Sequence, residues 1–199
     1  MPIVEPEVLM DGHQTLARCE EVTGLTLQAV FGALFAHRVA LHSILLKTGM
    51  VLPGKKCRRQ ADPAEVAEAT IRCLRQVVPA AVPGILFLSG GQHDVAATTR
   101  LNAICRVKGV PWTLSFSFGR ALQNAAMKTW TGTAANIGAA RTALLHRARC
   151  NGRAVQGKYL ASMEHEATSR QNRISAGRAS PSHRRAPKAL ERFKLKGSP

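Results

Sequence analysis

Leu41-His42-Ser43-Ile44-Leu45-Leu46-Lys47 is an apolar run that ends in a lysine, and residues 48–54 follow it as a loop. The run has the length and composition of a buried β-strand. A lysine at the end of such a strand is unusual, because burial of an ammonium group is costly. Desolvation lowers the pKa of a lysine, and the free amine can attack a ketone to form a Schiff base. Alternatively, Lys47 simply reaches water through its long stem.

Three other short apolar runs also end in polar or glycine-rich residues. They are Ile3-Val4 before Glu5-Pro6-Glu7, Gly84–Leu88 before Ser89-Gly90-Gly91-Gln92, and Trp112–Phe116 before Ser117-Phe118-Gly119-Arg120. Helical patterns separate and follow the runs, over residues 11–37, 62–78, 93–107, 119–130 and 136–153. Within them, Asp62-Pro63 is typical of an N-cap followed by proline at the first helical position. Strands that alternate with helices indicate βα units and a parallel sheet.

Functional side chains of a parallel α/β sheet gather at the carboxyl ends of its strands. The candidate residues at these ends are Glu5, Glu7, Lys47, Ser89, Gly90, Gly119 and Arg120. They supply an acid/base pair on one predicted strand side, an amine nucleophile and an anion-binding set. Glycines let backbone N–H groups approach a phosphate, a helix N-terminus favours the anion, and arginine binds phosphate oxygens in pairs. The alternatives are two solvated acids at a strand end, and two tight turns beside a surface arginine.

A series of longer motifs follows the same order along the chain. The stretches are Ile3–Leu9, Leu45–Lys47, Val78–Ile85, Phe87–Gln92, Leu101–Ile104, Ser115–Gln123, Arg147-Ala148 and Gly157–Tyr159. In this order they resemble class I fructose-bisphosphate aldolase, over about residues 2–159. The sequence departs from the family pattern at His42, Thr48 and Phe118, and in the loop 54–60, which is rich in Lys and Arg.

The resemblance implies an α/β fold that is part of a (β/α)8 TIM barrel. It implies that the chain corresponds to strands five to eight with their helices. Glu5, Lys47, Ser89 and Arg120 would lie at the carboxyl ends of these four strands, in that order. A complete barrel needs roughly 250 residues, whereas this chain has 199, so length also favours a half barrel. The first half of the family barrel carries a catalytic aspartate and two further lysines. These cannot be assigned to any position of this sequence.

The resemblance also implies a reaction in glycolysis, the reversible cleavage of fructose 1,6-bisphosphate to dihydroxyacetone phosphate and glyceraldehyde 3-phosphate by a lyase. Lys47 would form the Schiff base, Glu5 would be the acid/base for carbinolamine dehydration, and Glu7 would hydrogen-bond near the lysine. The substrate C1 phosphate would bind to Ser89, Gly90, Gly119 and Arg120. No cofactor or metal is expected.

The composition changes after Tyr159. Residues 1–160 form the predicted half barrel, and residues 161–199, here called the tail, hold nine Lys and Arg residues against three glutamates. With few apolar residues, the tail is expected to be disordered. The five cysteines are scattered without a CxxC pair, which favours reduced thiols in the cytoplasm over a metal site. No apolar stretch is long enough for a membrane span, and no secretion signal is visible.

Three interpretations of function remain open. The first is a truncated aldolase with weak or no activity alone, and the second is a non-catalytic half-barrel remnant that acts as a structural or interaction protein. The third is a basic nucleic-acid-associated protein, suggested by the net charge of +16. That charge also suits anionic sugar phosphates, and no nucleic-acid recognition motif is present. Open sheet edges favour association, so the expected partners are a second copy or a complementing first half.

Overall fold

The chain divides into two units, Met1–Ala167 and Thr168–Pro199. The structure is a computed structural model that describes residues 1–165, all of which belong to the first unit. From residue 166 onward the tail lies outside the described residues. The predicted boundary between residues 160 and 161 therefore stays a prediction.

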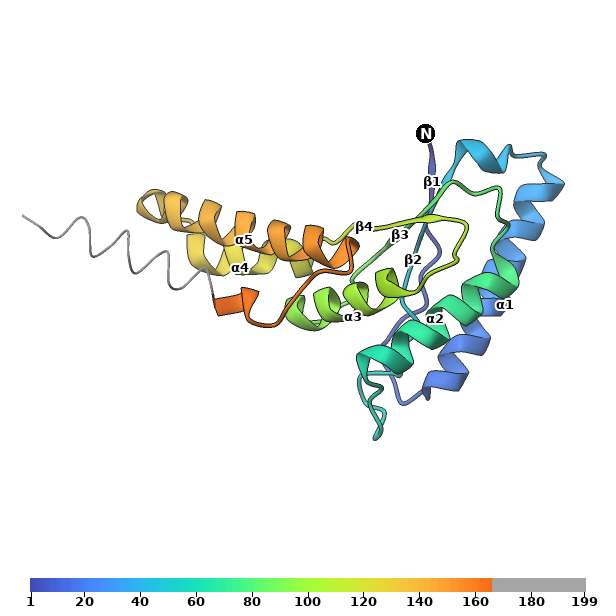
Figure 1. Cartoon of the computed structure of the whole chain (residues 1–199), viewed down its shortest axis with the longest axis horizontal. Coiled ribbons are helices and arrows are strands. Elements are labelled where there is room, and N and C mark those ends of the chain that lie inside the picture. The colour runs from blue at the N-terminus through green and yellow to red at the C-terminus, as the bar shows by residue number, and fades with distance from the viewer. Residues whose placement is uncertain (166–199) are drawn as a thin grey trace, which may run out of the picture. The chain divides into compact units, whose positions relative to one another are not determined.

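In the described part of the chain, four parallel strands form one sheet in the order β1-β2-β3-β4 (Figure 1). Their bounds are β1 Ile3–Val4, β2 Leu45–Thr48, β3 Gly84–Phe87 and β4 Thr113–Phe116. The predicted parallel sheet is confirmed, but the strand predicted from Leu41 begins only at Leu45. A 3₁₀ turn occupies Leu41–Ser43, where the Ser43 N–H bonds to the Ala40 carbonyl and the Ile44 N–H bonds to the Leu41 carbonyl. These local hydrogen bonds take the backbone groups that a longer strand would pair with its neighbour.

Within residues 1–165, five α-helices connect and follow the strands. They are α1 Leu16–Ala36, α2 Pro63–Val77, α3 Asp94–Arg106, α4 Arg120–Trp130 and α5 Ile137–Val155. Helix α2 confirms the predicted cap: Asp62 Oδ1 accepts hydrogen bonds from the N–H groups of Ala64 and Glu65, and the Glu65 carboxylate accepts from the Asp62 N–H. This reciprocal capping box satisfies N–H groups that have no partner within the helix.

Helix α1 begins at Leu16 rather than at Asp11, so its predicted start was wrong. Thr15 caps it by accepting a hydrogen bond from the Arg18 N–H. The residues before Thr15 are held elsewhere, because the carbonyls of Gly12 and Gln14 accept hydrogen bonds from the backbone of the loop after β2. Because these carbonyls bond to the loop, residues 11–15 do not extend the helix toward the N-terminus.

The two faces of the sheet differ in burial. Leu46, Ile85 and Phe87 are completely buried in the main core, together with residues of α1, α2, α3 and α5. Side chains alternate between the faces of a strand, so Lys47 and Leu86 lie on the opposite face, where both are only partly buried. The helices therefore cover one face, and the other face carries Lys47.

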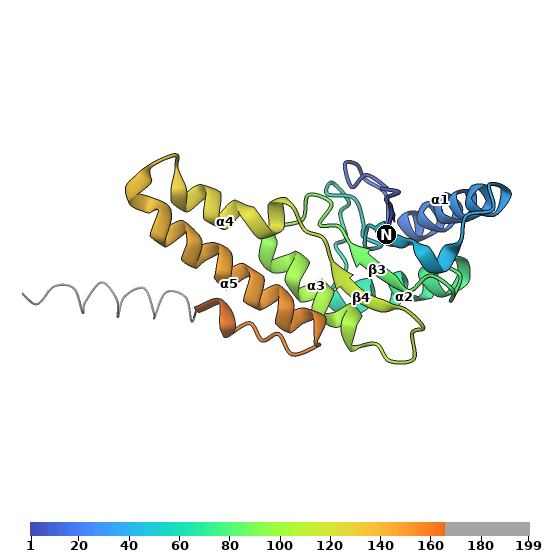
Figure 2. The ribbon, with the colours of Figure 1, turned by 90° about the horizontal axis from the view of Figure 1, so that it is seen from above.

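Neighbouring helices pack in the series α1-α2-α3-α5-α4. Figure 2 shows α4 and α5 lying side by side as a hairpin beyond the end of β4. Within residues 1–165 no helix has the length and apolar character needed to cross a lipid bilayer.

Candidate active site

Lys47 and Glu5 meet at the end of two paired strands. Val4 is the register partner of Leu46. The residues that follow these two, Glu5 and Lys47, therefore lie next to each other. Lys47 Nζ lies 2.7 Å from Glu5 Oε1, and the two side chains are 20% and 47% exposed. An amine on the uncovered sheet face thus has a carboxylate within proton-transfer distance. This arrangement can serve a reaction in which a proton is delivered to, or taken from, an amine adduct.

Glu5 and Glu7 both follow the end of β1 at Val4. The prediction that their side chains lie on one side of a strand stays a prediction, because neither residue belongs to a strand. Glu7 points toward the turn after β3, since a Cβ added at Gly90 would lie 3.9 Å from Glu7 Oε1. Glu7 therefore approaches the predicted anion-binding turn.

The turn after β3 brings cations to a glycine pair. Gly90 and Gly91 have φ angles of 53° and 74°, a region that residues with a Cβ rarely adopt. A Cβ added at Gly91 would lie 2.9 Å from Lys55 Nζ and 4.0 Å from Arg120 Nη2. Two positive side chains, one from the loop after β2 and one from the start of α4, therefore converge over this turn. Ser89 itself is buried beside it.

Arg120 is the first residue of α4, and Gly119 is its N-cap. No side chain among the described residues caps this helix start. The first N–H groups of α4 thus remain available to an anion, whose charge the helix dipole also favours. Gly90, Gly119 and Arg120, three of the predicted residues, thus form an arrangement that can bind an anion.

Lys55 is the functional candidate that sequence reasoning missed. Its N–H donates to the Met10 carbonyl, and its amine forms an ion pair with Asp11 at 3.1 Å. These contacts hold the loop after β2 near Gly91. The only signal in the sequence was the richness of residues 54–60 in Lys and Arg, which did not distinguish Lys55 from its neighbours.

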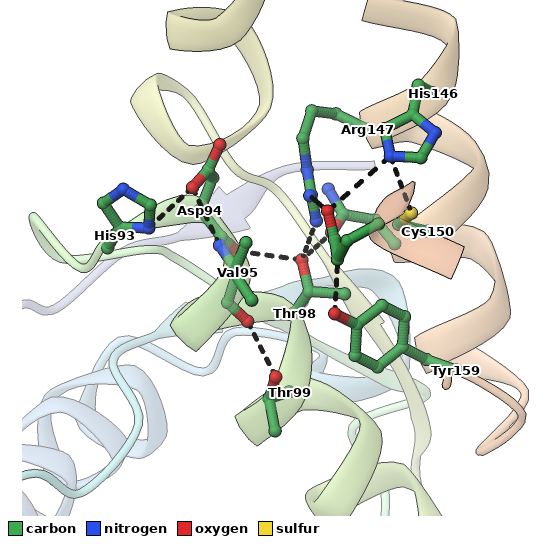
Figure 3. Close-up of polar contacts among 11 residues, drawn as sticks. His93, Asp94, Val95, Thr98, Thr99, His146, Arg147, Cys150 and Tyr159 are labelled. Atoms are coloured by element: carbon green, nitrogen blue, oxygen red, sulfur yellow. Dashed lines mark hydrogen bonds and ion pairs between the residues drawn. The ribbon is translucent and has the colours of Figure 1, made fainter. Parts of the chain in front are cut away.

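A second polar cluster joins α3, α5 and the segment after α5 (Figure 3). Arg147 is almost completely buried, donates to Thr98 Oγ1 at 2.7 Å and forms an ion pair with Glu164. The Tyr159 hydroxyl donates to the other Glu164 oxygen at 2.7 Å. Burial, followed by this hydrogen bond, raises the pKa of Tyr159 to about 12. Burial alone would raise the pKa of Glu164, but Tyr159 and Arg147 together lower it below its usual value.

This cluster predicts two limits to stability. Glu164 has a lowered pKa in the folded state. Its contribution to the free energy of unfolding is therefore complete above its ordinary pKa of 4.5, and it is lost as the pH falls from there through the lower pKa of the folded state. Tyr159 has a raised pKa, so its contribution is present below pH 10 and is lost between pH 10 and about 12. Urea unfolding across both ranges should show both losses. Tyr159 is the only tyrosine, so its absorbance can be titrated directly in the folded chain. An alkaline loss that persists unchanged in Tyr159→Phe would contradict the assignment.

A family model described as fructose-bisphosphate aldolase class-I matches residues 1–178. The chain belongs to the class I fructose-bisphosphate aldolase family. The probable fructose-bisphosphate aldolase class 1 of Xanthomonas axonopodis pv. citri is 48% identical over 160 residues, which are 80% of this chain and 48% of that protein. The fructose-bisphosphate aldolase cytoplasmic isozyme 2 of Pisum sativum is 49% identical over 160 residues, 80% of this chain and 44% of that protein.

A solved structure shares the fold of this aldolase-family chain. It is the Plasmodium falciparum fructose-bisphosphate aldolase in complex with TRAP and a small-molecule inhibitor, with a TM-score of 0.79 and 44% identity. The match covers 80% of this chain and 46% of that one. The chain therefore spans about half the length of the relatives it matches.

Proposed function

We propose that this chain carries the Schiff-base half of a fructose-bisphosphate aldolase, with β1 to β4 as strands five to eight of a (β/α)8 barrel. The half barrel would comprise residues 1–160, and residues 161–199 would form a basic tail. One observation carries the proposal: Lys47 Nζ lies 2.7 Å from Glu5 Oε1 on the sheet face that the helices leave uncovered. In a closed barrel that face would line the interior, where the substrate of the family is bound at the strand ends.

The proposed chemistry begins when the free amine of Lys47 attacks the C2 ketone of fructose 1,6-bisphosphate. Glu5 delivers the proton with which the carbinolamine oxygen leaves as water, and a protonated imine remains. The imine accepts the electron pair of the C3–C4 bond as that bond breaks, the ionised Glu5 takes the proton of the C4 hydroxyl, and glyceraldehyde 3-phosphate departs as the aldehyde. Protonation and hydrolysis of the enamine then release dihydroxyacetone phosphate and restore the lysine. Glu7 would act beside this pair through a hydrogen bond.

The C1 phosphate would bind at the glycine turn and the start of α4. Ser89 and Gly90 would supply the turn, and Gly119 with Arg120 would supply helix N–H groups and a guanidinium. We add Lys55 to this set, because its amine lies over Gly91 close to Arg120. No cofactor takes part in this scheme.

The proposed partners are a phosphorylated sugar and a polypeptide that completes the barrel, either a first-half barrel or a second copy of this chain. Within the described residues β1 pairs only with β2, and β4 only with β3. Both edges thus offer unpaired backbone groups, which favour strand addition. We propose a cytoplasmic location, as the Pisum sativum relative is named a cytoplasmic isozyme.

Borohydride reduction in the presence of dihydroxyacetone phosphate, followed by peptide mass spectrometry, tests the proposal. A reduced adduct on the peptide that contains Lys47 is expected, because formation of the imine needs only the amine, a proton donor and a bound phosphate. If the soluble, folded chain gives no adduct, the alternative of a non-catalytic half-barrel remnant replaces the proposal.

A further inference from the structure

A histidine, a cysteine and a glutamate meet near the end of α5, away from the residues of the proposed Schiff-base chemistry. His146 and Cys150 are four residues apart, so they lie on the same side of the helix, and Glu164 comes from the segment that follows. Nε2 of His146 lies 3.6 Å from Sγ of Cys150 and 3.6 Å from Oε2 of Glu164. The three candidate ligand atoms all lie within 4.8 Å of one another. Figure 3 shows His146, Cys150 and Tyr159 converging around this point.

Two of these separations match the ligand spacing of a tetrahedral metal ion, and the third pair, Sγ of Cys150 and an oxygen of Glu164, lies within 4.8 Å. Zinc binds sulfur at about 2.3 Å and nitrogen or oxygen at about 2.0–2.2 Å, so a tetrahedron needs about 3.5 Å between sulfur and nitrogen and about 3.4 Å between nitrogen and oxygen. The two observed distances differ from these values by only a few tenths of an ångström. We propose that His146, Cys150 and Glu164 bind a zinc-like divalent cation, with the fourth position left to water.

The surroundings of the three side chains suit a bound ion. Cys150 is buried, whereas the side chains of His146 and Glu164 are 18% and 19% exposed, which leaves an entry path. The Tyr159 hydroxyl donates to Oε1 of Glu164, so that Oε2 is turned toward His146. Outer hydrogen bonds that orient a ligand in this way are a regular part of protein metal sites.

The ion pair between Arg147 and Glu164 is the competing explanation for this geometry. It already balances the carboxylate, and a guanidinium beside a cation lowers the affinity for that cation. Arg147 is also anchored to Thr98 through its other nitrogen, so it can keep its position while Glu164 shares an oxygen with a metal. The thiolate and imidazole donors select zinc or cobalt over magnesium and calcium, which prefer oxygen ligands.

Metal binding would fix the segment that follows α5 against that helix. Glu164 lies beyond the turn that contains Tyr159, so a metal would tie this segment to the helix through two additional ligands. The cation would bind with release of the Cys150 proton, since the thiolate is the ligand. Zinc would then stabilise the fold by an amount that grows with the logarithm of its free concentration above the dissociation constant.

Cobalt(II) titration of the full-length chain under metal-free, reducing conditions tests the site. A single cobalt ion per chain should produce a thiolate-to-cobalt charge-transfer band and the intense visible bands of tetrahedral cobalt, and zinc should displace it. Cys150→Ala and His146→Ala should lose the bands, and the matched control Cys57→Ala should keep them. Absence of a charge-transfer band in the wild-type chain overturns the proposal, as does a band that survives in Cys150→Ala.

The thermal unfolding midpoint provides a second readout, which also shows whether each variant folds. Zinc should raise the thermal unfolding midpoint of the wild-type chain, and should do so less or not at all in Glu164→Gln, which keeps the size of the side chain. If zinc shifts the midpoints of wild type and Glu164→Gln equally, Glu164 is not a ligand and the three-residue site is wrong.

Discussion

Replacement of Lys47 by arginine should abolish the reduced adduct that dihydroxyacetone phosphate forms with the wild-type chain under borohydride. Arginine keeps a positive charge and a long stem, and it can still pair with Glu5, so the strand end should remain folded. Its guanidinium stays protonated at all accessible pH values and offers no nucleophilic amine. The expected result in mass spectrometry is therefore a complete loss of the adduct rather than a weakening.

Lys56→Arg is the matched control for this prediction. Lys56 is an exposed lysine of the loop after β2, and it lies outside the proposed site. The control should retain the adduct at the wild-type level. Glu5→Gln should slow adduct formation by about 10²–10⁴-fold, the usual contribution of a general acid or base. An adduct of undiminished yield in Lys47→Arg, on any other lysine, would show that Lys47 is not the nucleophile.

The sequence predicted the regular elements well where local signals were strong. Asp62-Pro63 correctly predicted the start of α2, because capping depends only on residues within one helical turn. The start of α1 and the length of β2 were predicted wrongly for a shared reason. In both places the backbone hydrogen bonds go to partners that local periodicity does not report, namely the loop after β2 and the 3₁₀ turn Leu41–Ser43.

The candidate site was only partly visible in the sequence. The pairing of Lys47 with Glu5 depends on the strand register, which is a long-range property that a single strand does not encode. Lys55 was hidden among similar residues of its loop. The cluster of His146, Cys150 and Glu164 was missed because the cysteines were compared with zinc motifs of paired cysteines. This set has one cysteine, and its candidate ligands come from two segments.

The 199-residue chain should cleave fructose 1,6-bisphosphate far more slowly than a complete member of its family. The resemblance implies that a catalytic aspartate and two further lysines come from the first half of the family barrel, and none of them can be assigned to a position of this sequence. Each missing proton-transfer group costs about 10²–10⁴-fold in rate. Steady-state cleavage assays should therefore find activity at or near background, even where the Lys47 adduct forms. Turnover comparable to that of the complete Xanthomonas relative would contradict this expectation.

A complementing half should restore the activity, and a second copy of the chain should not. The part of the Xanthomonas relative that lies outside the matched 48% would supply the missing groups and two strand edges for β1 and β4. Its addition should raise turnover in the wild-type chain and leave the Lys47→Arg variant at background. A self-associated dimer, detected by light scattering, would close the same edges but bring no aspartate or lysine of the first half. Size and turnover measured together therefore separate closure of the barrel from completion of its chemistry.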